Sequence, residues 1–212
     1  LFDSTRIIYT SDHGETAGAR GLFGKHTMYD ESAAVPLVLA GPDVPSNRVV
    51  TTPVSLVDCF PTVLDGLASE PASEDADLPG RALWQIAREE DVDRIVFSEY
   101  HAIGSKTAAY MLRDARYKYV YHVGGMPQLF DMVVDPSETD DLGTSGEHKN
   151  RIEEFEKCLR ALIDPEETDA MARQDQREKV EAFGGKEAVL RRGSFDNSPV
   201  PGEPPAFQKF QP

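Results

Sequence analysis

Cysteine is scarce in this chain of 212 residues, and Cys59 and Cys158 lie far apart. Two such residues cannot build the disulfide framework of a small secreted scaffold, so we expect buried thiols, with a reactive cysteine as the alternative. Long hydrophobic runs are missing too, since no apolar stretch approaches the ~20 residues that span a bilayer. We therefore predict no transmembrane helix, and the length suffices for one good-sized domain or a domain with a subdomain.

Basic residues are few compared with acidic ones. There are 22 Lys and Arg against 37 Asp and Glu, which gives a formal charge of −15. Such a field repels nucleic acid, and it repels an anionic substrate unless a metal or local basic groups reverse the potential. An initiating methionine and a signal-peptide pattern are also missing, so we expect the chain to begin inside a longer protein. Localisation, cytoplasmic or periplasmic, stays open.

The first part of the chain, residues 1–92, has the pattern of an α/β domain. Short β-branched or apolar runs at 6–10 and 35–42 predict buried parallel strands. Apolar residues at helical spacing predict a helix at 55–68, with Ser55 or Asp58 as its N-cap. The polar stretch 69–80 predicts a surface loop.

The rest of the chain divides in two. Residues 93–165 predict a small α+β subdomain, in which one helix near 148–163 backs an antiparallel sheet. The strands of that sheet are expected at 94–101, 107–114, 117–123 and 128–134, with Gly124-Gly125 as a hairpin turn. Residues 166–212 predict a helix followed by an extended tail rich in Pro and Gly, which lacks periodicity.

Residues 9–42, "YTSDHGETAGARGLFGKHTMYDESAAVPLVLAGP", carry the candidate chemistry. Asp12 and His13 follow the first strand, where ligands bind in α/β sheets, and together they suit a divalent cation. Glycines would let the loop fold tightly before Lys25, whose charge suits a sulfate or phosphate oxygen. An Asp-His pair is also common in turns, and a lysine after glycine is often merely solvated, so spacing alone leaves both interpretations open.

The order of several motifs resembles the C-terminal half of a sulfatase, in the alkaline phosphatase superfamily. The resemblance begins in "SDHGE…GLFGKHTMYDESAAVPLVLAGP" and continues in "VSLVDCFPTVLDGLA", "LPGRAL", "RYKYVY" and "QLFDMVVDPSETDDL". It implies an alkaline-phosphatase-like α/β sandwich, of which residues 1–92 are part, followed by the α+β subdomain and the tail. The His after the Asp is similar to the choline-sulfatase and phosphonate-hydrolase side of the superfamily.

The resemblance also implies roles for four residues. Asp12 and His13 match a pair of metal ligands, usually for Ca²⁺, with Mn²⁺ or Mg²⁺ as alternatives. Lys25 matches the lysine that contacts the sulfate group and would act in both binding and catalysis. His101, in "SEYHAIGS", is a candidate substrate contact at the mouth of the site. The alternative for His101 is a strand-end histidine bonded to a backbone carbonyl.

The nucleophile of such an enzyme is not expected in this chain. In the family it is a formylglycine made from Cys or Ser in a Cys/Ser-x-Pro-x-Arg motif nearer the N-terminus. Here "CFPTV" offers Cys-x-Pro, but Val63 stands in place of the Arg, and Cys59 lies within the predicted helix. We therefore predict that Cys59 is a core residue, and that the nucleophile and further metal-binding aspartates come from an upstream part of the same protein.

These observations predict a sulfuric ester hydrolase acting on a small sulfate ester, with this chain alone inactive. One alternative is a phosphonate monoester or phosphodiester hydrolase on the same scaffold. Another is a non-catalytic binding module. The expected partners are the N-terminal half of the same protein and, through the tail, a second copy in a homo-oligomer.

Overall fold

The structure is a computed structural model that describes residues 2–89, 92–102 and 104–193. The chain forms two compact units, residues 1–165 and 166–212, which are described separately. The Pro/Gly-rich tail at 194–212, with its predicted role in oligomer formation, lies outside the described residues. The division into parts 1–92, 93–165 and 166–212 stays a prediction.

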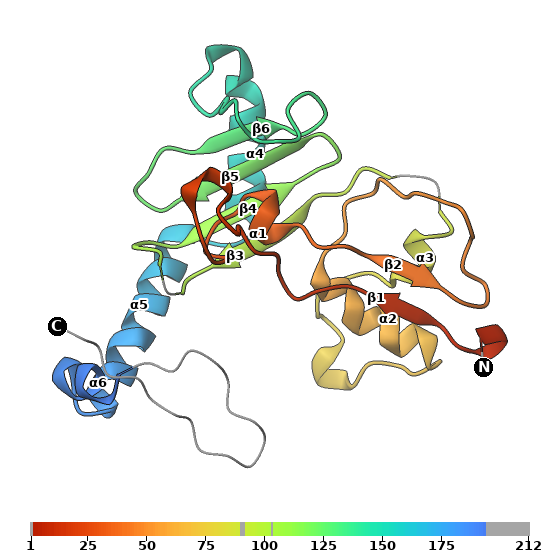
Figure 1. Cartoon of the computed structure of the whole chain (residues 1–212), viewed down its shortest axis with the longest axis horizontal. Coiled ribbons are helices and arrows are strands. Elements are labelled where there is room, and N and C mark those ends of the chain that lie inside the picture. The colour runs from red at the N-terminus through yellow and green to blue at the C-terminus, as the bar shows by residue number, and fades with distance from the viewer. Residues whose placement is uncertain (1, 90–91, 103, 194–212) are drawn as a thin grey trace. The chain divides into compact units, whose positions relative to one another are not determined.

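The centre of the first unit is a four-stranded antiparallel sheet with the strand order β3-β4-β5-β6 (Figure 1). Its strands lie within the four predicted segments, which confirms them. They are β3 (Val96–Tyr100), β4 (Ala109–Arg113), β5 (Tyr117–His122) and β6 (Gln128–Asp131). Gly124 has a φ of 74° in the turn between β5 and β6, a left-handed conformation that favours glycine.

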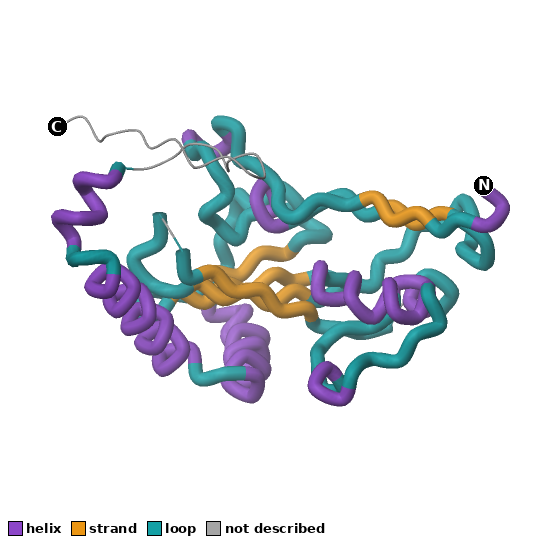
Figure 2. The backbone as a smooth tube through the Cα atoms, turned by 90° about the horizontal axis from the view of Figure 1, so that it is seen from below, coloured by secondary structure: helices purple, strands orange, loops and turns teal. Residues whose placement is uncertain are grey.

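Successive side chains of each strand point to opposite faces, and both faces of this sheet are apolar. Figure 2 shows a helix along one face of the sheet and loop segments along the other. One face packs on the predicted helix, α4 (Lys149–Leu162), where the rings of Tyr119 and Phe155 stack at 5.7 Å. The other face carries Ala109, Met111 and Val120 and is covered by Met28, just before the short helix α1 (Asp30–Ala33). The stretch that contains the candidate site therefore packs directly on the C-terminal sheet.

The prediction of buried parallel strands near the N-terminus is wrong for this chain. Strand β1 (Ile7–Tyr9) pairs antiparallel with β2 (Val38–Ala40), so that Ile7 lies opposite Ala40. In both strands only the middle residue is partly buried, and Tyr9 is 63% exposed. The apolar runs in the sequence predicted the strands, but an apolar run does not show whether a strand pairs parallel or antiparallel.

The predicted helix at 55–68 forms as α2 (Cys59–Gly66), and it is tied to the start of β3 by Asp58. The Asp58 side chain is fully buried and accepts hydrogen bonds from the backbone N–H groups of Ser55 and Arg81, both at 2.8 Å. Arg94 donates to both carboxylate oxygens, at 2.8 and 2.6 Å. This one carboxylate therefore joins α2, the loop after it and the chain entering β3.

The remaining helices are short or lie in the second unit. Helix α3 (Leu83–Ile86), which sequence patterning did not predict, packs on α2 through Trp84, whose Nε1 donates to the carbonyl of Thr62 at 2.8 Å. All of α5 (Pro165–Ala182) except its first residue lies in the second unit, and this helix was predicted. The second unit also contains α6 (Lys186–Arg192), which was not predicted. The 3-10 helices are η1 (Phe2–Ser4), η2 (Ala19–Gly21), η3 (Leu56–Asp58), η4 (Ser73–Asp75) and η5 (Gly146–His148).

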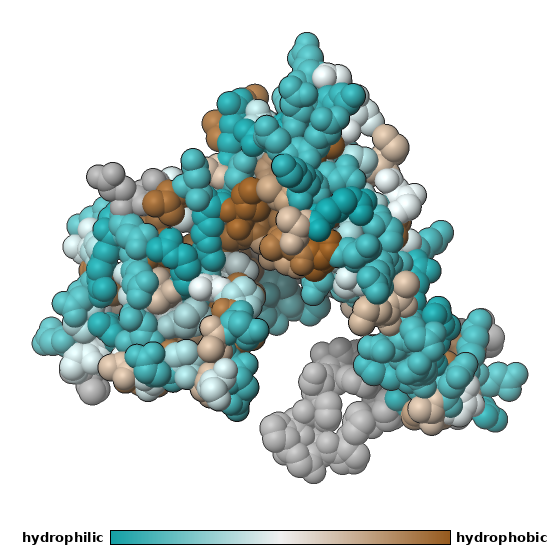
Figure 3. Space-filling view, turned by 180° about the vertical axis from the view of Figure 1, so that it is seen from behind, coloured by the Kyte–Doolittle hydropathy of each residue, from teal (hydrophilic) through white to brown (hydrophobic). Residues whose placement is uncertain are grey.

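Hydrophobic side chains also reach the surface of the protein in patches between hydrophilic ones (Figure 3). Among the described residues, α2 and its preceding turn expose an apolar row, and β1 and β2 expose further large side chains. The row on α2 consists of Val57, Phe60, Val63 and Leu67, which are 43–70% exposed. None of the described helices combines the length and hydropathy needed to cross a membrane.

Candidate functional site

The candidate site lies in the loop that leaves β1, and two of its glycines are required by geometry. A Cβ on Gly14 would lie 2.1 Å from the carbonyl oxygen of Glu31, so no larger residue fits there without a backbone shift. Gly24, just before Lys25, has a φ of 92°. Glycine adopts this left-handed conformation without the steric penalty that other residues incur. The loop can therefore reverse direction sharply at the residue that precedes Lys25.

Two side chains that sequence patterning did not single out close the base of this loop. Thr16 donates from both its backbone N–H and its hydroxyl to the carbonyl of Gly24, at 2.9 and 2.8 Å. The carboxylate of Glu15 accepts from the backbone N–H groups of Ala17 and Gly24, and these bonds lower the pKa of Glu15 below its usual range. The loop thus folds back so that Lys25 returns to the start of the stretch.

The structure brings Asp12, His13 and Lys25 together in one cluster. The ammonium Nζ of Lys25 contacts Nε2 of His13, and the carboxylate of Asp12 lies 3.3 Å from the same nitrogen. The Asp12 side chain is 83% exposed and that of His13 is 37% exposed, so the cluster is open to solvent. Desolvation raises the pKa of Asp12, but His13 and hydrogen bonds to the carboxylate outweigh it and lower the pKa. Asp12 is therefore a carboxylate at neutral pH.

The tautomer of His13 is set by its other ring nitrogen. Nδ1 lies 2.8 Å from the carbonyl oxygen of Gly14, which can only accept, so Nδ1 carries the hydrogen. In the neutral ring, Nε2 then presents a lone pair, and it is this lone pair that faces Lys25. A backbone carbonyl that accepts from Nδ1–H is one of the usual outer partners of a metal-ligating histidine.

The cluster offers two donors to a cation and one charge to an anion. A carboxylate oxygen and an imidazole nitrogen on adjacent residues suit a divalent metal. Within the described part of the chain, no group of three or more His, Cys, Asp or Glu side chains could hold a metal ion. Asp12 and His13 therefore form at most part of a coordination shell. Lys25 is exposed and can approach a bound anion.

His101 lies in different surroundings from this cluster. Its Nε2 is 3.1 Å from the carboxylate of Glu99, and its ring packs edge-on against Tyr110 at 5.4 Å. Tyr110 belongs to the core between the sheet and α4, whereas Tyr100 packs in the core on the opposite face. The described contacts of His101 are thus on the α4 side, and a role in substrate binding stays a prediction.

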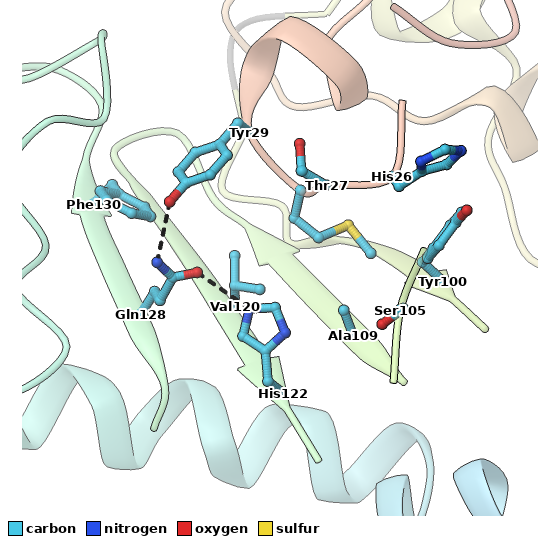
Figure 4. Close-up of a pocket in the computed structure, with 11 residues that line it drawn as sticks. His26, Thr27, Tyr29, Tyr100, Ser105, Ala109, Val120, His122, Gln128 and Phe130 are labelled. Atoms are coloured by element: carbon cyan, nitrogen blue, oxygen red, sulfur yellow. Dashed lines mark hydrogen bonds between the residues drawn. The ribbon is translucent and has the colours of Figure 1, made fainter. Parts of the chain in front are cut away.

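A cavity of about 240 Å³ begins at the residue after Lys25 (Figure 4). It lies between segment 26–29 and the sheet face opposite α4, and a hydrogen-bonded chain runs along its wall. His122 Nε2 is 3.2 Å from the side-chain oxygen of Gln128, whose amide nitrogen donates to the Tyr29 hydroxyl at 3.4 Å. Among the described residues, the lining has no Asp, Glu, Lys or Arg and consists of His26, Thr27, Met28, Tyr29, Tyr100, Ser105, Ala109, Val120, His122, Gln128 and Phe130.

Cys59 does not have the surroundings of an activated nucleophile. Cys59 and Cys158 are free thiols, each partly buried. Burial, followed by the nearby charge of Asp58, raises the pKa of Cys59, whereas a reactive cysteine needs a lowered pKa. Cys59 begins α2, as the sequence interpretation placed it within a helix.

Comparisons with known proteins agree on one family. The profile described as "N-sulphoglucosamine sulphohydrolase, C-terminal" matches residues 18–180. Arylsulfatase K of Danio rerio is 36% identical over 171 residues, covering 76% of this chain and 32% of that protein. Arylsulfatase K of Mus musculus is 33% identical over 193 residues, covering 84% of this chain and 34% of that protein.

Solved structures of a sulfatase and of a phosphonate monoester hydrolase also match most of this chain. BT1596, a 2-O GAG sulfatase, matches with a TM-score of 0.66 and 27% identity, over 82% of this chain and 38% of that one. The phosphonate monoester hydrolase of Agrobacterium radiobacter matches with a TM-score of 0.62 and 28% identity, over 76% of this chain and 35% of that one. The chain spans about a third of the length of the curated relatives it matches. It belongs to the sulfatase family, and it corresponds to the C-terminal region described by that profile.

Proposed function

We propose that the full-length protein containing this chain is a sulfuric ester hydrolase that acts on a small sulfate ester. The observation that carries the proposal is the cluster of Asp12, His13 and Lys25 at the end of β1, in a chain of the sulfatase family. A metal-type donor pair beside a solvent-exposed ammonium suits an anionic ester in a chain whose formal charge of −15 would otherwise repel it.

Asp12 and His13 would hold a divalent cation, for which we propose Ca²⁺. Their donors fit, because the Gly14 carbonyl fixes the hydrogen on Nδ1 of His13 and leaves Nε2 as a ligand. When bound, the cation would polarise the oxygens of the ester. The Nε2 lone pair can serve either a metal or Lys25 but not both. Metal binding at His13 would therefore release the Lys25 ammonium for the sulfate group.

Lys25 would neutralise charge on the sulfate oxygens as the ester bond breaks. A positive group held beside the reacting centre acts most strongly where charge develops in the transition state. The attacking group, formylglycine in the family, and the remaining metal ligands would come from the N-terminal half of the same protein. The exposed apolar row on α2 is a surface that this missing half could cover.

Removing the Asp12 carboxylate tests the metal proposal. Asp12→Asn in the full-length protein is expected to weaken Ca²⁺ binding at least about tenfold, because a ligating charge is lost. Metal content after dialysis against defined free Ca²⁺, repeated with Mn²⁺, measures the effect. Asp43→Asn is the matched control, since the Asp43 side chain is 74% exposed and pairs with Arg6 away from the cluster. Unchanged metal stoichiometry and affinity in Asp12→Asn would remove Asp12 from the ligand set.

A phosphonate monoester hydrolase is the second candidate function. It is supported by the match to the Agrobacterium radiobacter enzyme, whose identity of 28% is similar to that of the 2-O GAG sulfatase. The ratio of kcat/KM for an aryl sulfate to kcat/KM for a phenylphosphonate monoester separates the two. We expect this ratio to favour the sulfate.

A further inference from the structure

Lys118 is a buried lysine that connects the C-terminal sheet to the candidate site loop. Its side chain is 1% exposed and extends from β5 toward the sheet face opposite α4. Nζ donates to the carbonyl of Met28 at 3.1 Å and pairs with the carboxylates of Asp30 and Glu138, the latter at 2.7 Å. A buried ammonium is tolerated when acceptors of this kind surround it.

Glu138, in the turn after β6, is the second buried member of this network. Its side chain is 1% exposed, and its Oε2 accepts from the backbone N–H of Asp30 at 2.8 Å. Arg20 donates to the backbone carbonyls of Glu138 and Ser137, at 2.9 and 2.5 Å, and lies over the ring of Tyr29 at 3.9 Å. The turn therefore binds the site loop at two separate places.

The anchored places lie on both sides of Lys25 in the chain. Arg20 precedes Lys25, whereas Met28 and Asp30 follow it, and all three bond to Lys118 or to the Glu138 turn. Residues 21–27 carry Lys25 between these anchors, and Gly24 among them is also bonded to Glu15 and Thr16. A shift of either anchor would move the Lys25 ammonium relative to His13, which it contacts.

Stability alone does not require charged groups at this place. Apolar residues of similar volume often replace buried ion pairs with no loss of stability, or with a gain. Apolar side chains already pack on the same sheet face, where Met28, Met111 and Val120 form a cluster. Charged groups fix geometry more specifically than apolar contacts, because each acceptor must lie at a defined distance.

We infer that Lys118 and Glu138 are positioning residues that hold Lys25 in place by anchoring the two ends of its loop. This inference rests on the proposed function, because it assigns the pair an effect on the reaction through Lys25. It gives the C-terminal sheet and the turn after β6 a part in catalysis, although Lys118 and Glu138 need not touch the substrate.

A double-mutant cycle in the full-length protein tests the inference. Lys118→Met is expected to lower kcat/KM for an aryl sulfate about 10- to 100-fold, since small displacements of a reacting group have effects of this size. In a Lys25→Ala background the same change is expected to lower kcat/KM less than about twofold, because the group that Lys118 positions is already gone. Equal losses in both backgrounds would overturn the inference, as would a loss below twofold in the wild-type background.

The control and the second variant guard against a general folding effect. Arg116→Met removes one partner of another ion pair at the start of β5, where Arg116 bonds Asp131 at 2.9 and 2.7 Å. This variant is expected to keep wild-type kcat/KM. If Lys118→Met does not fold, Glu138→Gln, which keeps the size of the side chain, takes its place in the cycle with the same expectations.

Amide hydrogen exchange separates failure of the inference from failure of the proposed function. Lys118→Met is expected to speed exchange of the amides of residues 20–30, and Arg116→Met is not, whether or not the wild-type protein hydrolyses sulfate esters. An inactive wild-type protein would overturn the function alone. Unchanged exchange at residues 20–30 in a folded Lys118→Met variant would overturn the positioning role.

Discussion

Replacing Lys25 with alanine in the full-length protein is expected to lower kcat/KM for sulfate esters about 10²- to 10³-fold. The reason is electrostatic. Lys25 contacts His13 and is exposed to solvent, so its ammonium can meet a sulfate oxygen in the transition state. The same exposure means that few folding contacts depend on Lys25. We therefore expect the melting temperature to stay close to that of the wild-type protein while the rate falls.

Initial rates with an aryl sulfate and a thermal unfolding curve measure the two effects together. Lys149→Ala is the matched control, because Lys149 is 74% exposed and pairs across the surface of α4 with Glu153. It should change neither quantity, as such surface pairs contribute about 0–1 kcal/mol. Turnover by Lys25→Ala near the wild-type value would contradict the role assigned to Lys25.

A large effect on stability is expected from Asp58. Asp58→Asn removes the charge of a fully buried carboxylate and leaves Arg94 without its anion. Breaking one partner of a buried pair typically costs about 3–5 kcal/mol of unfolding free energy. By contrast, Glu89→Gln alters the Arg81–Glu89 pair, whose side chains are about 40% exposed, and is expected to cost about 0–1 kcal/mol. Denaturant unfolding of the full-length variants measures both.

The difference in unfolding free energy between the wild-type protein and Asp58→Asn should depend on pH in a defined direction. Burial raises the pKa of Asp58, but hydrogen bonds from Arg94, Ser55 and Arg81, with the charge of Arg94, outweigh it and hold the pKa below the usual 3.8. A lowered folded pKa stabilises the protein above about pH 4, and the benefit disappears as the pH falls through the folded value. The difference in unfolding free energy between the wild-type protein and Asp58→Asn should therefore become smaller in acid. A gap that widens below about pH 4 would contradict the account.

Much of the fold could be predicted from the sequence because its elements are strongly patterned. Strands β3 to β6 are short runs rich in apolar and aromatic residues, separated by turn residues, and helix α4 buries Phe155 and Leu159 at helical spacing, so both were placed correctly. The direction of β1 and β2 was predicted wrongly, because an apolar run does not show which neighbour a strand will have. Helices α3 and α6 are short, and short helices are weakly patterned.

Only those residues of the candidate site that lie close together in the sequence could be predicted. Asp12, His13 and Lys25 share one loop, and the motifs around them resemble a known family. The tautomer of His13 and the hydrogen bond between Thr16 and Gly24 depend on three-dimensional geometry, which residue spacing does not show. Lys118 was missed because a lysine in an alternating strand is expected to face solvent. Its only hint was Val120, an apolar residue on the same face of β5.

The measurement that tests the central claim most directly is the release of inorganic sulfate from an aryl sulfate by the full-length protein, compared with cleavage of a phenylphosphonate monoester. We predict that kcat/KM is higher for the sulfate and that the 212-residue chain alone releases none, because Asp12, His13 and Lys25 bind and polarise but do not attack. A full-length protein that prefers the phosphonate, or that releases no sulfate, would contradict the proposal that this chain is part of a sulfuric ester hydrolase.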